Sequence, residues 1–278
     1  MCAKRLAVRA IWERQAVRAV DSHMRYLIIV FATTWLFQAP ALLAEHGQER
    51  FGGLVVLGFF GPLLIAMGLC AREGKGAWRA LFAPLGRWRV PLAYYLIALA
   101  LPCAIFIVSR AFAAAVGGQE LGPWFYPPHE AQHMAAMLLI PFTEQIPWRG
   151  YLYPRLESKL GPLNASLFTG FAWGLFHVQK HLFIDPNASW PLAALTILFM
   201  TAGTVVFTWF YRRSGGSLLL VVIANMGAYL NNPAWALPNL TPLAIHTLGY
   251  CACAAAFVLL DRETWSTAPS RVAETPAE

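Results

Sequence analysis

The stretch Pro141-Phe-Thr-Glu-Gln-Ile-Pro-Trp-Arg-Gly-Tyr-Leu-Tyr-Pro-Arg155 places polar side chains inside an apolar run that has the character of a membrane span. Glu144, Gln145 and Arg149 stand where lipid would favour Leu or Val. Charged residues are rare in spans, because their removal from water is costly unless they find partners, and they are usually functional. The structural alternative is an ion pair that only locks helices together. The stretch therefore predicts a helical membrane protein with a polar site in its interior.

The composition also indicates a membrane protein. Of the 278 residues, 58% are hydrophobic and 13% are charged, whereas about 25% of the residues of a soluble domain are charged. The net charge is +7, but basic residues of membrane proteins mark the cytoplasmic side, so no nucleic-acid partner is predicted. The five cysteines are scattered and form neither a disulfide framework nor a zinc-finger spacing. We expect one all-α membrane domain rather than two soluble ones.

The hydropathy pattern predicts eight membrane spans, because a span needs about 20 apolar residues. They cover approximately residues 26–44, 51–71, 90–115, 131–153, 163–178, 190–211, 216–231 and 243–260. The fifth and seventh are short, as expected for tilted helices beside a thinned or water-filled cavity. The chain thus divides into a basic amino-terminal segment (1–25), a transmembrane domain (26–260) and a disordered tail (261–278).

The placement of charges predicts the orientation. Nearly all Lys and Arg residues outside the spans fall on the same side as the amino-terminal segment, and Arg50 and Lys180 are the exceptions. The opposite loops carry the acidic residues Glu45, Glu49, Glu120, Glu130 and Asp185. The positive-inside rule therefore predicts a multi-pass protein of a plasma (inner) membrane with both termini in the cytoplasm. The segment 1–25 fits either an amphipathic helix on an anionic membrane surface or a plain basic lead-in.

Polar and aromatic side chains recur at helical spacing in three of the predicted spans. In each span two of them stand four residues apart and therefore share one face of the helix. The pairs are Gln145 with Arg149, Trp173 with His177, and Asn225 with Tyr229. Glu144 lies one residue round the helix from the first of these pairs. The fourth, fifth and seventh spans are therefore expected to line a common polar site.

A hairpin brings two of these groups to the same depth. Its turn is marked by Gly161 and Pro162, and Glu144 lies 17 residues before Gly161 while His177 lies 16 residues after it. If both arms are helical, the two side chains stand at nearly the same depth. A carboxylate and an imidazole so placed can together bind and deprotonate one water, which is general-base chemistry. The alternative is that His177 is a packed, hydrogen-bonded residue.

A metal site is the other chemical alternative. His177 and His181 are four residues apart, as in helical zinc sites, and Glu144 could be a third ligand. The signature with Glu directly after the first His is missing, because Val178 stands there. Lys180, beside His181, would also repel a cation. We therefore predict no metal and no cofactor.

Three motifs resemble those of the CPBP family of intramembrane proteases, the CAAX-protease and bacteriocin-processing family also called Abi. Glu144-Gln-Ile-Pro-Trp-Arg-Gly-Tyr-Leu-Tyr-Pro-Arg-Leu resembles the first motif, Glu-Glu-x-x-x-Arg-Gly. Phe171-Ala-Trp-Gly-Leu-Phe-His177 resembles the second, an aromatic residue four before a His. Gly216-Ser-Leu-Leu-Leu-Val-Val-Ile-Ala-Asn225 resembles the third, a Gly-Ser helix start leading to His-x-x-x-Asn. The resemblance covers about residues 130–232, the motif-bearing core.

This resemblance implies a glutamic endopeptidase that needs no metal, in a family that includes the Ras-converting enzyme acting on prenylated CAAX proteins. It implies that Glu144 and His177 activate the water and that Arg149 anchors the glutamate motif, with Trp173 in support. The expected partners are membrane lipid and a peptide or protein substrate with a membrane-proximal or lipidated segment.

Three positions depart from the family pattern. Gln145 replaces the second Glu of the first motif, and Asn225 and Tyr229 replace the His and Asn of the third. The family pair is thought to stabilise the oxyanion, and both Asn and Tyr can donate hydrogen bonds to one, so activity is chemically possible. A degenerate member acting as an immunity, scaffold or chaperone protein is the first alternative. A small-solute transporter is the second, although the chain shows no internal repeat of the kind such proteins usually carry.

Overall fold

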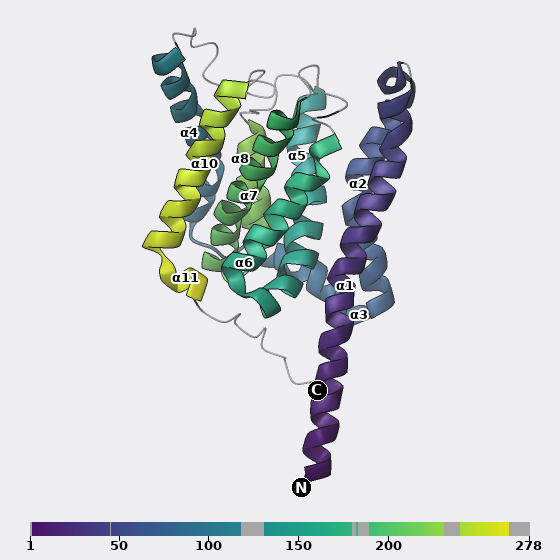
Figure 1. Ribbon diagram of the computed structural model, residues 1–278. Helices are drawn as coiled ribbons and strands as arrows, with labels where there is room; N and C mark the ends of the chain where they lie inside the picture. Colours follow the sequence, from purple (N-terminus) through teal and green to yellow (C-terminus); the bar gives the residue numbers. More distant parts are fainter. Residues whose placement is uncertain are drawn as a thin grey trace.

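The computed structural model describes residues 2–44, 46–117, 131–179, 182, 189–230 and 240–266, and its secondary-structure elements there are all helices. They are α1 (Cys2–Leu43), α2 (Gly47–Glu73), α3 (Lys75–Phe82), η1 (Ala83–Gly86), α4 (Leu92–Gly117), α5 (Ala131–Gln145), η2 (Ile146–Leu152), α6 (Tyr153–Phe176), α7 (Trp190–Arg213), α8 (Leu218–Leu230), α10 (Leu240–Leu260) and α11 (Arg262–Ser266). The long helices stand side by side (Figure 1). The predicted all-α polytopic helix bundle is confirmed.

Five helices of the described part are long and apolar enough to cross a membrane. They are Ser22–Leu43, Arg50–Glu73, Leu92–Val116, Trp190–Arg213 and Leu240–Leu260, and they match the first, second, third, sixth and eighth predicted spans. The other three predicted spans are helical too. However, α5 and α6 contain polar residues, and α8 is a shorter apolar helix of 13 residues. The count of eight spans therefore stays a prediction.

The amino-terminal segment continues into the first span without a break. The α1 helix runs from Cys2 to Leu43, and its apolar span begins at Ser22, close to the predicted start at residue 26. The sequence contains no Gly or Pro before Pro40, so it has no residue that would end a helix near position 25. In Figure 1 the amino-terminal half of α1 accordingly extends beyond the rest of the bundle.

The tail also begins later than predicted. Residues 262–266 form α11, in which Trp265 is buried and donates a hydrogen bond from its indole to the carbonyl of Phe257. Asp261 accepts a hydrogen bond from the indole of Trp209 on α7 at 2.8 Å. These contacts hold the chain against the bundle after α10, so the prediction of disorder is wrong for residues 261–266. Residues 267–278 lie outside the described part.

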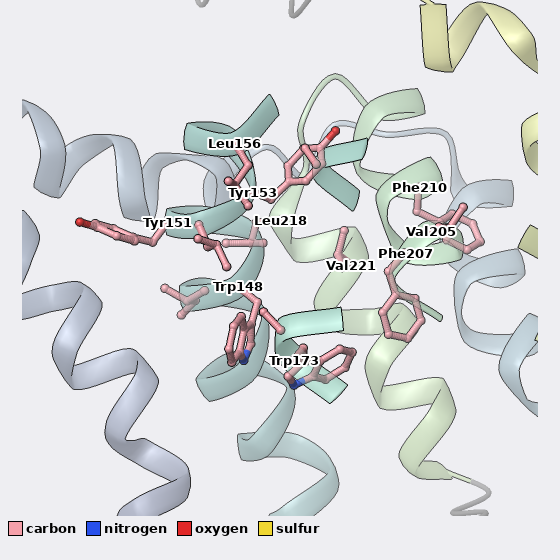
Figure 2. Close-up of a cluster of buried hydrophobic side chains, with 14 of the residues drawn as sticks. Trp148, Tyr151, Tyr153, Leu156, Trp173, Val205, Phe207, Phe210, Leu218 and Val221 are labelled. Carbon is pink, nitrogen blue, oxygen red and sulfur yellow. The ribbon is translucent and has the colours of Figure 1, made fainter. Parts of the chain in front are cut away.

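The core lies where η2, α6, α7 and α8 meet, and Figure 2 shows the large side chains that fill it. The backbones of α6 and α7 approach closely at Gly170 and Gly174. A Cβ atom at Gly170 would lie 2.6 Å from Thr201 Cα, and one at Gly174 would lie 2.7 Å from Ile197 Cα. Small residues allow membrane helices to approach in this way. The contact fixes the end of α6 that carries His177.

Candidate active site

The first motif lies at a change of helix type. Pro147 has no N–H, so the α-helical hydrogen bond to the carbonyl of Thr143 cannot form. From Ile146 to Leu152 the chain adopts a π-helix whose seven residues are all buried. Single π-helical turns within helices are frequent at functional sites. Glu144 and Gln145 are the last two residues of α5, directly before this turn.

Glu144 is 9% exposed and faces α8. Its Oε2 accepts a hydrogen bond of 2.8 Å from the side-chain amide of Asn225. Its Oε1 lies 3.5 Å from the hydroxyl of Tyr229 and 3.8 Å from Nε2 of His177. The structure therefore brings together the four residues that the sequence predicted as catalytic. Asn225 and Tyr229 both direct donors at the Glu144 carboxylate, which neither the spacing nor the family resemblance had indicated.

His177 caps the carboxyl end of α6, where its Nδ1 lies 2.8 Å from the carbonyl oxygen of Trp173. A carbonyl can only accept, so Nδ1 carries the hydrogen, and Nε2 of the neutral ring has a free lone pair. The 3.8 Å between this atom and Glu144 Oε1 is too long for a direct hydrogen bond. A gap between two polar atoms in this range suits a bridging water.

Gly161, at φ +76°, interrupts α6 and supplies the predicted turn of the hairpin.

Arg149, in the π-helical turn after Glu144, is fully buried. It donates from Nη1 to Gln145 Oε1 at 2.5 Å and from Nη2 to Thr204 Oγ1 at 2.8 Å. Its guanidinium carbon also lies 4.7 Å from the ring centre of Trp173 and 5.2 Å from that of Phe207. Hydrogen bonds to neutral oxygens and contacts with aromatic faces both stabilise a buried cation. Arg149 thus ties the end of α5 to α6 and α7.

The sequence missed Thr204, because no local spacing relates it to Arg149, which lies 55 positions away. Trp173 and Gln145, predicted as supporting residues, both contact the guanidinium of Arg149. His181, the second possible metal ligand, lies outside the described residues. Within the described residues no three side chains of His, Cys, Asp or Glu come together as a metal site would require. The prediction that no metal takes part therefore still rests on the sequence alone.

Comparisons with known proteins show which family this chain is similar to. Residues 130–230 match the family model described as type II CAAX prenyl endopeptidase Rce1-like. The CAAX prenyl protease 2 of Methanococcus maripaludis is 22% identical over 257 residues, which cover 86% of this chain and 93% of the relative. The matched family segment contains Glu144, His177 and Asn225. The resemblance drawn from the three motifs is confirmed, and a CAAX-type membrane endopeptidase is supported.

Proposed function

We propose that the chain hydrolyses a peptide bond at or near the membrane with a water activated by Glu144 and His177. The premise is that residues 130–230 form the core of a type II CAAX prenyl endopeptidase Rce1-like protein. The observation that carries the proposal is the 3.8 Å separation of Glu144 Oε1 and His177 Nε2 in a buried site. Both atoms are acceptors when His177 is neutral. A single water can donate one hydrogen to each.

The water then has both hydrogens engaged and its lone pairs directed at the substrate. As its oxygen attacks the scissile carbonyl carbon, one proton passes to Glu144, and the carbonyl π bond becomes an oxyanion. Collapse of this tetrahedral intermediate breaks the C–N bond, and the proton held by Glu144 moves to the leaving amine. A positioned acid–base group of this kind contributes about 10²–10⁴-fold to the rate.

Asn225 and Tyr229 supply donors for the oxyanion. An amide NH₂ carries two hydrogens, and one of those of Asn225 is used on Glu144 Oε2. The second is left for the oxyanion. The hydroxyl of Tyr229 makes only a long contact of 3.5 Å with Glu144 Oε1, so it can turn to the oxyanion at little cost. These donors take the role that the resemblance gives to the third-motif pair.

The substrate class we propose is a peptide or protein whose cleavage site lies beside a lipidated or membrane-inserted segment. The relative from Methanococcus maripaludis is named for CAAX prenyl substrates, and the buried site of this chain lies among apolar helices. We also propose that both termini lie in the cytoplasm, from the distribution of Lys and Arg. Reporter fusions after Arg262 and in the segment around residue 185 should report opposite sides of the membrane.

The test uses the full chain purified into lipid nanodiscs with a fluorescence-quenched peptide ending in a farnesylated CAAX sequence. The same peptide without the farnesyl group is the matched substrate control. We expect cleavage of the farnesylated peptide that is lost in Glu144→Ala. Cleavage of both peptides by the Glu144→Ala variant at the wild-type rate would overturn the proposal, as would a wild-type protein inactive towards farnesylated, geranylgeranylated and membrane-anchored peptides alike.

A further inference from the structure

A second buried polar pair lies two residues beyond His177. Nε2 of Gln179 donates a 2.8 Å hydrogen bond to Oε1 of Gln38 on α1, which is 141 positions away in the sequence. Gln38 is fully buried and Gln179 is 5% exposed. Gln179 Oε1 has no hydrogen-bond partner in the described part of the chain, so the bond to Gln38 is what holds this amide. It ties the end of α6 to α1.

The α1–α2 pair is built to bury Gln38. At Gly58 of α2 a Cβ atom would lie 2.9 Å from both Cγ and Nε2 of Gln38, so any side chain there would displace the amide. One turn earlier on α1, Thr34 donates a 3.4 Å hydrogen bond to the Gly58 carbonyl, and a Cβ at Gly61 would lie 2.8 Å from the Thr34 hydroxyl. Small residues facing polar ones are the usual seam between membrane helices. Here the seam presents Gln38 to Gln179.

The same two helices also contact His177 or the residue before it. Phe59, next to Gly58, lies with its ring centre 6.2 Å from that of His177, at an interplanar angle of 32°. It also contacts Phe176 at 6.3 Å, and Phe31 of α1 contacts Phe176 at 6.4 Å. The helices α1 and α2 thus contact three groups: Phe176, the imidazole of His177 and the amide of Gln179. An apolar pair in place of the two glutamines would satisfy packing without burying amides.

We propose that Gln38 is a positioning residue, which acts through Gln179 to hold the end of α6 so that His177 Nε2 faces Glu144. The inference rests on the proposed function for its kinetic consequence. The orientation of the imidazole can be measured without substrate. Displacements of about 1 Å in a catalytic group cost as much as 10²-fold in rate, so a loose end of α6 should lower kcat more than it changes KM.

The main variant is Gln38→Met, which keeps the length of the side chain and removes the acceptor. Gln38→Glu keeps an acceptor for Gln179 and serves as the rescue, and Gln179→Met breaks the same bond from the other side. The matched control is Thr33→Ala, which removes a half-buried hydroxyl of α1 that bonds to the carbonyl of Ile29 in its own helix. Two readouts are taken: kcat and KM on the farnesylated peptide, and the ¹⁵N spectrum of the histidines, with His177 assigned through His177→Gln.

For Gln38→Met and Gln179→Met we expect kcat to fall about 10- to 100-fold with KM within about twofold, and the His177 signal to change from a single Nδ1–H tautomer to a mixture. Gln38→Glu and Thr33→Ala should keep both readouts near wild type. An unchanged tautomer in both methionine variants would overturn the inference, and so would an equal loss in Thr33→Ala. If the wild type cleaves no peptide, the proposed function fails, and the tautomer still decides the role of Gln38.

Discussion

Glu144 and Glu157 are equally buried, each 9% exposed, yet their carboxylates have opposite surroundings. Glu157 forms an ion pair with Arg212 and accepts a hydrogen bond of 2.9 Å from Tyr153. Glu144 has neutral donors, Asn225 and Tyr229, and an imidazole at 3.8 Å. A guanidinium occupies the lone pairs of a carboxylate permanently, whereas neutral donors orient it and leave a lone pair for a proton. Glu157 is therefore placed as a structural anchor, and Glu144 is suited to the role of base that we propose for it.

The anchor joins three helices. Arg212, which pairs with Glu157 of α6, also donates from Nε to the carbonyl of Thr264 at 2.6 Å, so α6, α7 and α11 meet at this ion pair. Breaking a buried pair by removing one partner costs about 3–5 kcal/mol, because the other charge is left uncompensated. Glu157 is therefore expected to be needed for the bundle, whereas Glu144 is the carboxylate that we propose for the chemistry.

The largest expected effect is that of Glu144→Ala on catalysis. We expect proteolysis to fall by about 10²–10⁴-fold, because the base is removed without added bulk. The free energy of unfolding should fall less than in Glu157→Ala, because Asn225 and Tyr229 are neutral and the buried guanidinium of Arg149 keeps its hydrogen bonds to Gln145 and Thr204. Initial rates on the farnesylated peptide and a denaturant titration of the same sample measure both quantities.

Glu157→Ala is the matched control and should show the reverse. Its kcat should stay within a few-fold of wild type, and its free energy of unfolding should fall by about 3–5 kcal/mol. If Glu157→Ala abolished cleavage in a protein that is still folded, or if Glu144→Ala cleaved normally, the contrast between the two carboxylates would be wrong.

The second prediction concerns Asn225, which orients Glu144 and faces the oxyanion. Asn225→Leu should lower kcat by about 10²–10³-fold, the usual cost of one oxyanion donor. Asn225→His restores the residue of the family motif and a donor nitrogen, so it should keep activity or raise it. Equal rates for the wild type and Asn225→Leu would show that Asn225 is a packing residue. It would also overturn the assignment of the third motif.

Residues within one hairpin were predictable, because helical rise and the turn at Gly161 fix their relative depth. The depth argument for Glu144 and His177 therefore predicted a contact that the structure contains. Rotation of one helix about its axis relative to another is not encoded in such spacing. The sequence thus identified Asn225 without indicating that it would bond to Glu144, and it gave no sign of the π-helix after Gln145.

Partners that come from distant segments were missed for the same reason. Thr204 and Gln38 are ordinary polar residues within apolar helices, and their roles appear only once those helices are packed against Arg149 and Gln179. The family resemblance did not supply them either, because Gln38 lies outside the matched segment 130–230 and Thr204 belongs to none of the three motifs. Sequence reasoning thus found the residues proposed for the chemistry and missed the residues that hold them.

A smaller effect is expected for Tyr229→Phe. The hydroxyl lies 3.5 Å from Glu144 Oε1, so its bond in the free enzyme is weak, and its loss should hardly affect folding. We expect kcat to fall about tenfold, less than the 10²–10³-fold typical of a fully engaged oxyanion donor. Asn225→Leu with Tyr229→Phe should then be no worse than the product of the single losses. If Tyr229→Phe cleaves at the wild-type rate, Tyr229 does not stabilise the oxyanion. That role would then belong to Asn225 and to donors that reach the oxyanion only when substrate is bound.

The smallest effect is expected from metal removal. We expect no change in kcat, because the residues around Glu144 do not form a complete metal site. A catalytic zinc site needs three protein ligands and one open position. His177 offers only Nε2, because its Nδ1 is bonded to the carbonyl of Trp173. Glu144 offers Oε1, while Oε2 is held by Asn225. The cluster therefore provides two ligand atoms of the three required.

The third ligand that the sequence suggested is His181, which follows Lys180 in the chain. We therefore expect dialysis against a strong chelator to leave kcat within about 20% of its starting value, and His181→Ala to behave in the same way. Loss of activity on chelation, restored by stoichiometric zinc in the wild type but not in His181→Ala, would make Glu144 a metal ligand. The neutral surroundings of Glu144 would then leave it able to bind a metal cation. The contrast with Glu157, which is already paired with Arg212, would be one between two cation-binding carboxylates and not between an anchor and a base.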